Sequence, residues 1–399
     1  MRCCASLRYE PKSMSFYFTL NTGSSSVKFA LYKAQAEPDL FISGIVERLG
    51  PSARLKMQTP GEDIVRELGT VDHASAVVAI FAKMEPYLQG QPVVGIGHRI
   101  VHGGNAFFKP TELTSEVVQK LEQMIPLAPL HQPYSLATIR AAKQVFPGVL
   151  QIGCFDTAFH AGHTFPNDAF AIPRHFYEEG VRRYGFHGLS FDYICSEMRR
   201  EHPDVANGRL VIAHLGNGAS MCAVEEGRSI NASTSFSAVD GLAMGTRCGR
   251  LDPGVMLYLM QEKELSAAEI ESIIYRRSGL LGLSEESSDM RVLEHSEELF
   301  SKQAINYYCY QIRREVGAMA ATLEGIDALI FSAGIGENSA RVRSSVCEPL
   351  EFLGITIDQE KNMANAPEIG TGPVRVFIMP TNEEQVIARA VAEATAKTQ

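Results

Sequence analysis

A loop rich in glycine and serine, residues 21–26, has the composition of a phosphate-binding turn. Glycine lets the backbone approach an anion so that amide groups converge on it, and serine hydroxyls add further donors. Side chains alternate along the strand that follows, which places Lys28 on the same face as Ser26, within reach of the same anion. Taken alone, this pattern is more typical of an ordinary hairpin turn followed by a solvated lysine. The chain has no GxxxxGK[ST] motif, which excludes a Walker-type phosphate loop.

A second loop of the same kind, residues 216–220, lies about half a chain later. When the two loops are aligned, Gly23 falls opposite Gly218 and Ser25 opposite Ser220. One such match could arise by chance, but its spacing suggests two related domains that each open with a glycine-turned hairpin. Two phosphate hairpins that face each other across a cleft would be able to bind ATP.

Arginines in glycine-containing segments could stabilise the charge of a transferred phosphoryl group. Arg99 comes at the end of a strand-like run, where a guanidinium can bind a carboxylate or phosphate through two hydrogen bonds. Arg182, Arg183 and Arg247 lie in similar glycine-rich loops. Asp252 with the proline after it is typical of a helix N-cap. Arg247, just before that cap, is then free to point into the cleft.

Two further acids could take part in the chemistry. Asp156 follows a strand-like run, residues 149–155, which is a usual position for active-site residues in α/β folds, although a turn or cap role is about equally favoured. Near the C-terminus, Thr381 and Glu384 fit a capping box, so that Glu383 is the acid available to a metal ion. The rival interpretation is that both glutamates only cap the last helix.

The histidines fit a metal site poorly. His98 and His102 are four residues apart, which on a strand is about 13 Å and too far for one tetrahedral ion. A structural role is therefore favoured. A metal-dependent hydrolase that uses these two residues together with His160 and His163 fails on the same spacing.

The elements that position these residues alternate between strand-like and helix-like along the whole chain, which predicts an α/β fold. In the second half, one long helix is predicted from an apolar stripe at helical spacing, formed by Ile305, Cys309, Ile312, Val316, Met319 and Leu323. A strand at 328–331, a turn at 334–338 and another helix follow it. The last strand, residues 374–379, leads through Pro380 into a final helix.

The length of 399 residues predicts two domains, because single cores stop growing at about 250–300 residues. A net charge of −9 argues against general binding to nucleic acid or to an anionic membrane. No apolar run approaches the length of a membrane-spanning helix. The eight cysteines form no CxxC pair, which favours reduced thiols in a cytoplasmic protein. Residues 1–14 do not resemble a signal peptide and are expected to be a disordered extension, with either Met1 or Met14 as the true start.

A set of short segments, taken together and in order, resembles the acetate kinase family from about residue 16 to residue 384. Each segment is weak evidence alone, but the ordered set is very specific. The segments are 21–28, 97–104, 126–131, 155–160, 182–188, 214–218, 244–247, 287–291, 334–338 and 380–384.

The resemblance implies two duplicated actin-like (ribonuclease H-like) α/β domains around a nucleotide cleft, in a homodimer. The first domain would comprise residues 15–156 together with 384–399. The second, residues 157–383, would hold most of the nucleotide site and the dimer interface. The implied reaction is reversible phosphoryl transfer between ATP and acetate by direct in-line attack, which gives acetyl phosphate and ADP.

The resemblance also assigns roles to residues. Arg99 is similar to the arginine that binds the substrate carboxylate, and Asp156 to the catalytic acid. His187 and Arg247 match the groups that stabilise the transition state, so that these cations and magnesium would surround the transferred phosphoryl group with positive charge. The acyl methyl group would lie in an apolar pocket formed by Val101, Leu130, Phe186 and Ala238.

Asn21 and Glu383 look like ligands of Mg²⁺, with Mn²⁺ as a possible substitute, and Lys28 looks like an ATP contact. The remaining nucleotide site is implied to consist of His214, Leu215, Gly216, Asn217, Gly218, Asp289, Met290, Arg291, Gly334, Ile335, Gly336, Glu337 and Asn338.

Some positions depart from the family pattern: Gln132, Phe191 and Arg250 replace an asparagine, a second histidine and an acid. Residues 284–286 carry Glu285 and Glu286 in place of a glycine step, and two added carboxylates there could weaken ATP binding. Ala238 replaces a proline of the acyl pocket. This change should leave room for another carbon and predicts unusually good use of propionate.

Two alternatives remain open. Within the family, the chain could be a propionate or butyrate kinase. In a different class, it could be an actin-like ATP-binding switch without kinase activity, although the joint presence of Arg99, Asp156 and Arg247 counts against this.

Overall fold

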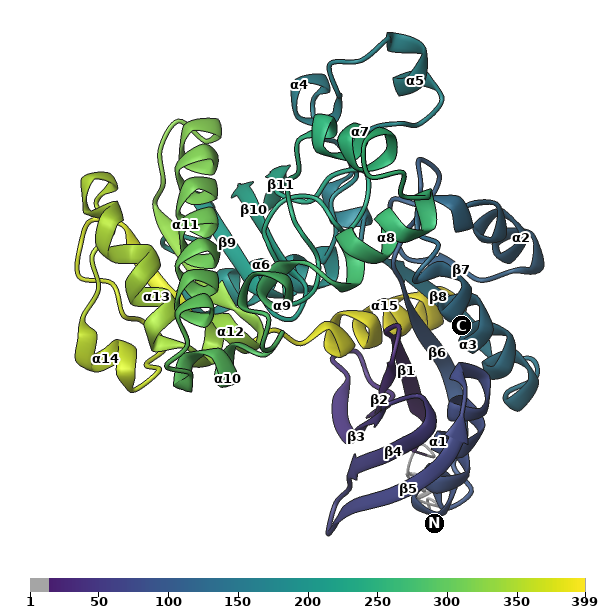
Figure 1. Ribbon diagram of the computed structural model, residues 1–399. Coiled ribbons are helices and arrows are strands. Elements are labelled where there is room, and N and C mark those ends of the chain that lie inside the picture. Colours follow the sequence, from purple (N-terminus) through teal and green to yellow (C-terminus); the bar gives the residue numbers. More distant parts are fainter. Residues whose placement is uncertain (1–13, 399) are drawn as a thin grey trace, which may run out of the picture.

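The computed structural model of this chain describes residues 14–398. All of the expected N-terminal extension except Met14 lies outside the described residues. The described chain forms two separate sheets, and one helix from the end of the chain returns to the first sheet (Figure 1).

The first sheet has eight strands in the order β5-β4-β3-β2-β1-β6-β8-β7. Their bounds are β1 (Phe16–Thr22), β2 (Ser26–Lys33), β3 (Asp39–Glu47), β4 (Gly50–Gln58), β5 (Asp63–Val71), β6 (Val93–Ile100), β7 (Thr111–Glu112) and β8 (Leu150–Phe155). The strand predicted after residue 149 and the hairpin predicted around residues 21–26 are both present.

Each face of the first sheet is covered by helices, because side chains of the central strand β1 alternate between its two faces. Phe16, Phe18 and Leu20 pack against α1 (His73–Leu88) and α3 (Gln132–Val145). On the other face, Tyr17 packs against α15 (Glu383–Thr398). The short helix α2 (Ser115–Gln123) packs beside α3.

The helix α15 lies very close to β6 because two residues of that strand have no side chain. A Cβ atom on Gly95 would lie 2.4 Å from Val391 Cγ1, and one on Gly97 would lie 2.2 Å from Ile387 Cγ2. Any larger residue would push the helix away from the sheet. In Figure 1, α15 runs from the second half of the molecule back across the first sheet.

The second sheet has five strands in the order β11-β10-β9-β12-β13. Their bounds are β9 (Arg209–Leu215), β10 (Ala219–Glu225), β11 (Arg228–Ala232), β12 (Ala328–Ser332) and β13 (Arg375–Ile378). The long helix α11 (Leu299–Thr322) covers one face and α6 (Gly188–Glu201) the other. The apolar stripe predicted for the long helix is buried against the sheet, which confirms that prediction.

The two sheets share the start of their topology. In the first, the antiparallel hairpin β1–β2 is followed by β6, parallel to β1, and then by β8, parallel to β6. In the second, the hairpin β9–β10 is followed by β12, parallel to β9, and then by β13, parallel to β12. The two similar loops seen in the sequence therefore join equivalent strand pairs, β1–β2 in the first sheet and β9–β10 in the second. The domain boundaries given above stay a prediction.

Nine further α-helices complete the described part of the chain. At the top of Figure 1 lie α4 (Phe165–Asp168) and α5 (Arg174–Glu178), with α7 (Pro253–Gln261) just below them and α8 (Ala267–Arg276) nearer the centre. The others are α9 (Gly279–Ser284), α10 (Met290–His295), α12 (Ala333–Asn338), α13 (Ala340–Cys347) and α14 (Gln359–Met363). Within residues 14–398, no helix combines the length and apolar character needed to cross a bilayer.

Two local predictions are wrong and one is confirmed. Residues 334–338 form the short helix α12, not a turn. Asn382, just before the last helix, caps it through Oδ1, which accepts a hydrogen bond from Gln385 N (3.0 Å), so the predicted capping box of Thr381 and Glu384 is absent. Asp252 does cap α7, and it accepts a hydrogen bond from the Gly254 amide at 2.7 Å.

Candidate active site

The two hairpin loops face one cavity of about 420 Å³. The first loop contributes Gly23 and Ser26, with Lys28 beyond it, and the second contributes residues 216–218. Ala333, at the start of α12, also lines this cavity and has φ 63°, a left-handed conformation that a residue with a side chain adopts only at some cost. We call this space the phosphate cavity. The prediction that the glycine loops meet across a cleft is confirmed.

Arg99 and Asp156 form a buried, two-pronged ion pair at the first sheet. Arg99 Nε donates to Asp156 Oδ1 at 2.9 Å, and Arg99 Nη2 donates to Oδ2 at 2.6 Å. The Asp156 side chain is 1% exposed. Burial raises the pKa of the Asp156 carboxyl, and the Arg99 guanidinium opposes this shift. Asp156 is therefore bonded to the arginine, and this contact favours a role in orienting the guanidinium over a turn role.

Arg99 also contacts the residues predicted to hold a metal ion. Its Nη1 donates to Asn21 Oδ1 at 3.1 Å, and its Nε lies 3.9 Å from Glu383 Oε2. The Asn21 amide donates to Glu383 Oε2 (2.8 Å) and to Glu384 Oε1 (3.0 Å). Glu384 thus faces the phosphate cavity together with Glu383 and is not available for a capping box with Thr381. Asn382 caps the helix instead.

The Glu383 carboxylate is held in its charged form. Burial raises the pKa of Glu383, but the neighbouring Arg99, His214 and Lys28 outweigh it, so that the net shift is downward. Carboxylate and amide oxygens are hard ligands of the kind that Mg²⁺ prefers, usually through one or two carboxylates together with substrate phosphates. The side chains at this end of the cavity therefore fit a magnesium ion.

Arg247 and His187 approach the second hairpin loop. A Cβ atom on Gly218 would lie 3.4 Å from His187 Nε2 and 3.6 Å from Arg247 Nη1. Arg247 Nη1 also donates to the Ala238 carbonyl at 2.8 Å. The two groups that the resemblance assigns to the transition state thus lie together beside a phosphate-binding loop.

His187 is a neutral side chain in this arrangement. Its ring stacks on that of His214 with centroids 4.4 Å apart, and its Nδ1 lies 2.8 Å from Ser220 Oγ. Burial, reinforced by His214, Arg99 and Arg247, holds the pKa of His187 well below its ordinary value. The expectation that His187 adds positive charge is not supported. The residue can instead act as a hydrogen-bond donor.

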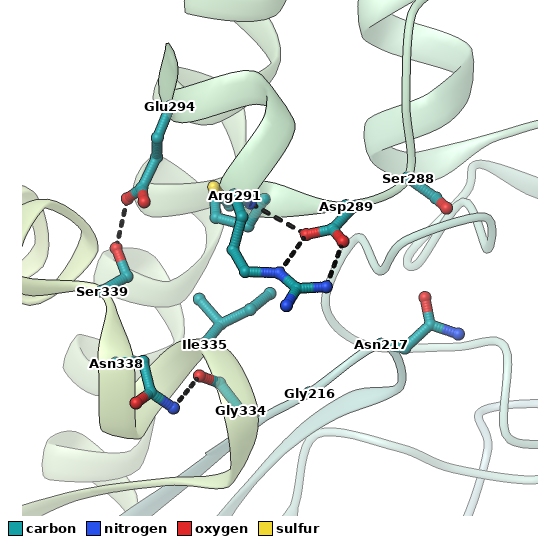
Figure 2. Close-up of a pocket in the computed structure, with 11 residues that line it drawn as sticks. Gly216, Asn217, Ser288, Asp289, Arg291, Glu294, Gly334, Ile335, Asn338 and Ser339 are labelled. Carbon is teal, nitrogen blue, oxygen red and sulfur yellow. Dashed lines mark hydrogen bonds and ion pairs between the residues drawn. The ribbon is translucent and has the colours of Figure 1, made fainter. Parts of the chain in front are cut away.

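A larger cavity of about 630 Å³ adjoins the phosphate cavity and shares Gly216, Asn217 and Gly334 with it. Figure 2 shows the residues that line it. The predicted residues in this lining are Asp289, Met290, Arg291, Ile335 and Asn338, and the structure adds Ser288, Glu294 and Ser339. We call this space the nucleotide cavity.

In Figure 2, the Arg291 side chain lies against Asp289 within this cavity. Arg291 Nη2 donates to Asp289 Oδ2 at 2.6 Å, and Asp289 Oδ1 accepts from the Arg291 amide at 2.9 Å. Asn338 Nδ2 donates to the Gly334 carbonyl (2.9 Å), which fixes the first turn of α12. Glu294 accepts a hydrogen bond from Ser339 Oγ.

Not every predicted nucleotide residue lines a cavity. His214 and Glu337 line the phosphate cavity, whereas Leu215 and Gly336 line neither space. Leu215 is fully buried, and the Gly336 carbonyl accepts a hydrogen bond from Arg343 at 2.8 Å. Leu215 and Gly336 therefore lie in the framework behind the site.

The added carboxylates of the 284–286 segment do not enter the nucleotide cavity. Glu286 Oε2 accepts hydrogen bonds from Ser296 (2.7 Å) and Ser301 (2.5 Å), and Glu285 is not part of the cavity lining. The expected weakening of ATP binding by these two residues has no structural basis. Glu294, which the sequence did not point to, lines this cavity as a second carboxylate besides Asp289.

A third cavity, of about 10 Å³, is lined by all the predicted acyl-pocket residues. Val101 and Phe186 are buried in it, and Ala238 packs against them. His131 and Tyr275 also line this cavity. A space of this size holds about one water-sized group, which is also the size of a methyl group. The structure does not show the additional room that the small Ala238 was expected to leave.

His131 was missed as a site residue although it lies in one of the family-like segments. Burial lowers the pKa of His131 to about 3, and Arg247 and Arg99 contribute to this shift. Both cations thus lie close enough to act on the same ring. His131 lines the third cavity, so the charges of Arg99 and Arg247 act on a ring at its wall.

The hydrogen bonds of His98 and His102 support the structural role predicted for these two histidines. His98 Nε2 lies 2.9 Å from Gln151 Oε1, and His102 Nδ1 accepts from the Gly104 amide at 2.8 Å. His160 and His163 share a hydrogen-bond partner, Ser229 Oγ, at 2.8 Å each. Across the described part of the chain, no three His, Cys, Asp or Glu side chains are grouped to hold a metal ion, which argues against the hydrolase interpretation.

The departures from the family pattern at Gln132, Phe191 and Arg250 lie outside the cavities. Gln132 is buried and donates to the His102 carbonyl at 3.2 Å. Phe191 packs against the rings of His160 and His214. Arg250 lies 3.5 Å from Glu315 in an ion pair.

Comparison with known proteins gives a consistent result. A family model described as the acetokinase family matches residues 16–389. The acetate kinase of Methylocella silvestris is 49% identical over 386 residues, which cover 93% of this chain and 96% of that protein. Among solved structures, a propionate kinase from Francisella tularensis has a TM-score of 0.90 at 32% identity and covers 95% of this chain and 100% of that chain. The acetate kinase of Porphyromonas gingivalis has a TM-score of 0.85 at 38% identity, with 96% and 99% covered.

Proposed function

Because this chain belongs to the acetokinase family, we propose that it transfers a phosphoryl group reversibly between ATP and acetate. Its two sheets have the duplicated actin-like α/β fold of that family. The family uses ATP and ADP as co-substrates, and the nucleotide cavity of about 630 Å³ is large enough for such a ligand.

The observation that carries the proposal is that three residues of the acyl cavity lie next to the site residues Arg99, His187 and Arg247. Val101 follows Arg99 by two residues, and Phe186 directly precedes His187. Ala238 is held by the hydrogen bond from Arg247. In each of these pairs, one member lines the acyl cavity, and the other lines the phosphate cavity or lies beside Gly218, which lines it. A methyl group bound in the acyl cavity would therefore point its carboxylate toward the terminal phosphate of ATP.

The reaction needs positioning and charge stabilisation more than covalent help. One carboxylate oxygen of acetate attacks the γ-phosphorus, and the bond from that phosphorus to the oxygen bridging it to ADP breaks on the opposite side. Arg99 and Arg247 stabilise the charge on the equatorial oxygens, and neutral His187 donates a hydrogen bond. Asp156 holds the Arg99 guanidinium in place. A bound Mg²⁺ supplies additional charge neutralisation at the phosphates, and Asn21 and Glu383 are the residues proposed to hold it.

A hydroxamate assay tests this function. Acetyl phosphate reacts with hydroxylamine, and we expect product only when ATP, acetate and Mg²⁺ are all present, with Mn²⁺ as a partial substitute. EDTA should abolish turnover because the phosphates lose their counter-charge. We also expect kcat/KM to fall by roughly 10- to 200-fold for each methylene added to the acid, given the small acyl cavity.

Several outcomes would contradict the proposal. ATP hydrolysis that ignores added carboxylic acids would indicate the switch-like class of actin-like protein. Propionate or butyrate turned over better than acetate would indicate the corresponding kinase of the same family. Full activity in EDTA would show that the reaction does not require Mg²⁺.

We further propose that the protein is a homodimer that uses α7. This helix has no buried residue although it is strongly apolar. Val255, Leu257, Tyr258 and Met260 are between 41% and 54% exposed, and contiguous apolar surface of this kind marks interaction sites.

Introducing a charge on this surface should produce a monomer. We expect Leu257→Asp to halve the mass measured by light scattering coupled to gel filtration, because an unpaired carboxylate would be buried in the interface. The matched control is Val78→Asp, at a residue of α1 that is 53% exposed, which should leave the mass unchanged. A monomeric wild-type protein, or a dimeric Leu257→Asp variant, would refute this interface.

A cytoplasmic location is proposed from the thiols. The cysteines within the described residues are all free, and most of them are buried. Free thiols persist where the surroundings are reducing.

A further inference from the structure

Tyr275 lines the acyl cavity but belongs to none of the family-like segments that pointed to the site. It lies near the end of α8, a helix that contributes nothing else to the cavities described above. Its side chain is half-buried, so one face of it remains open to solvent. Its presence explains a discrepancy between the sequence and the structure.

The discrepancy concerns Ala238. A small residue at this position should enlarge the acyl pocket, yet the cavity measures only about 10 Å³. Val101 and Phe186 belong to one apolar cluster, and Ala238 packs against it. Tyr275 lines the same space from a separate helix, and a phenol is large enough to occupy the volume of several methylene groups.

Backbone contacts fix the end of α8 to the segment that carries Arg247. Thr246 Oγ1 donates to the Tyr275 carbonyl at 2.9 Å, and the Cys248 amide donates to the Ile274 carbonyl at 2.9 Å. The Ser278 amide donates to the Thr246 carbonyl at 3.0 Å. Tyr275 is therefore held at a defined distance from Arg247. Burial lowers the pKa of Arg247, and the nearby phenol of Tyr275 opposes part of this shift. The phenol therefore lies near the guanidinium.

We propose that Tyr275 is a specificity-determining residue that closes the acyl cavity and restricts the acid to two carbons. The aromatic ring fills the volume that the small Ala238 would otherwise leave free. This inference rests on the proposed function, because it concerns the choice among short-chain acids at the same site.

The test compares acids in the full-length protein. For Tyr275→Ala, we expect the ratio of kcat/KM for propionate to that for acetate to rise by roughly 10-fold or more, the effect of one accommodated methylene. Because both acids are measured with the same preparation, a loss of folded protein would change both values equally and leave the ratio unaffected. Tyr275→Phe keeps the ring and should keep the wild-type ratio.

Further variants test whether the two residues share one space. Adding Ala238→Val to the Tyr275→Ala variant should refill the cavity and return the ratio toward the wild-type value. Tyr310→Ala removes a tyrosine of α11 that is 48% exposed and lies outside the acyl cavity, and it should leave the ratio unchanged.

The inference is overturned if the wild-type protein is active but Tyr275→Ala leaves the acid ratio unchanged. It is also overturned if Tyr275→Phe changes the ratio as much as Tyr275→Ala does, since the hydroxyl would then set the preference, or if Ala238→Val has no effect in the Tyr275→Ala background. A wild-type protein that forms no hydroxamate from any acid would instead refute the proposed function. The two failures are therefore distinguishable.

Discussion

Replacing Arg247 with alanine is expected to lower kcat by roughly 10³-fold, the loss seen when an arginine that stabilises a transferred phosphoryl group is removed. The guanidinium ends beside Gly218 in the second hairpin loop, close to His187. Its charge acts on oxygens that become more negative only as the phosphoryl group is transferred, so we expect the KM for ATP to change far less than kcat.

The measurement is the initial rate of hydroxamate formation at saturating ATP and acetate. Arg247→Lys should recover only part of the activity, because lysine keeps the charge but not the planar fork. Arg66→Ala, at an exposed position of β5, is the matched control and should have wild-type turnover. Near-normal turnover of Arg247→Ala would refute the role given to this residue.

Replacing Asp156 with asparagine is expected to reduce both stability and turnover. The substitution keeps the shape of the side chain but removes the charge that faces Arg99 at 2.6 Å. Breaking a buried ion pair costs about 3–5 kcal/mol, and we expect the lower end because Glu383 lies 3.9 Å from the same guanidinium. Arg99 would be drawn toward Glu383, and a displacement of about 1 Å can cost roughly 10²-fold in rate.

Urea unfolding measures the first effect as a lower midpoint at unchanged m-value, and the hydroxamate assay measures the second. Asp252→Asn is the matched control, since asparagine caps a helix about as well as aspartate does. Wild-type stability together with wild-type turnover would reduce Asp156 to a turn residue.

The local sequence pattern was sufficient to predict the hairpins and the long helix. Glycine between two β-rich runs predicts a tight turn, and this held for Gly23 and for Gly218 because both loops obey local backbone rules. The buried stripe of α11 was equally predictable, since helical periodicity needs no knowledge of the partner that the stripe packs against.

The sequence did not predict the features that depend on distant contacts. A capping box of Thr381 and Glu384 and a cap by Asn382 are both locally sound. The choice is made by Asn21, which is more than 360 residues away in the chain and hydrogen-bonds Glu384. The neutral state of His187 arises from burial and from cations on other segments, which no motif records.

Tyr275 shows the same limit for specificity. Nothing in the pattern of α8 distinguishes this tyrosine from an ordinary surface aromatic residue. Only the folded chain brings it to the cavity that Ala238 also lines. The size of one pocket residue is therefore a poor guide to the size of the whole pocket, because a residue from another segment can fill the vacated volume.

The last helix, α15, packs directly on Gly95 and Gly97, so the active site can form only after the end of the chain has been synthesised. The helix that fits against these glycines begins with Glu383, so the segment that closes the face of the first sheet also brings the proposed metal ligand. A polypeptide interrupted before this helix would lack that acid and would leave an apolar sheet face uncovered. Unfinished chains would thus be unable to consume ATP, and their bare sheet would mark them for proteolysis.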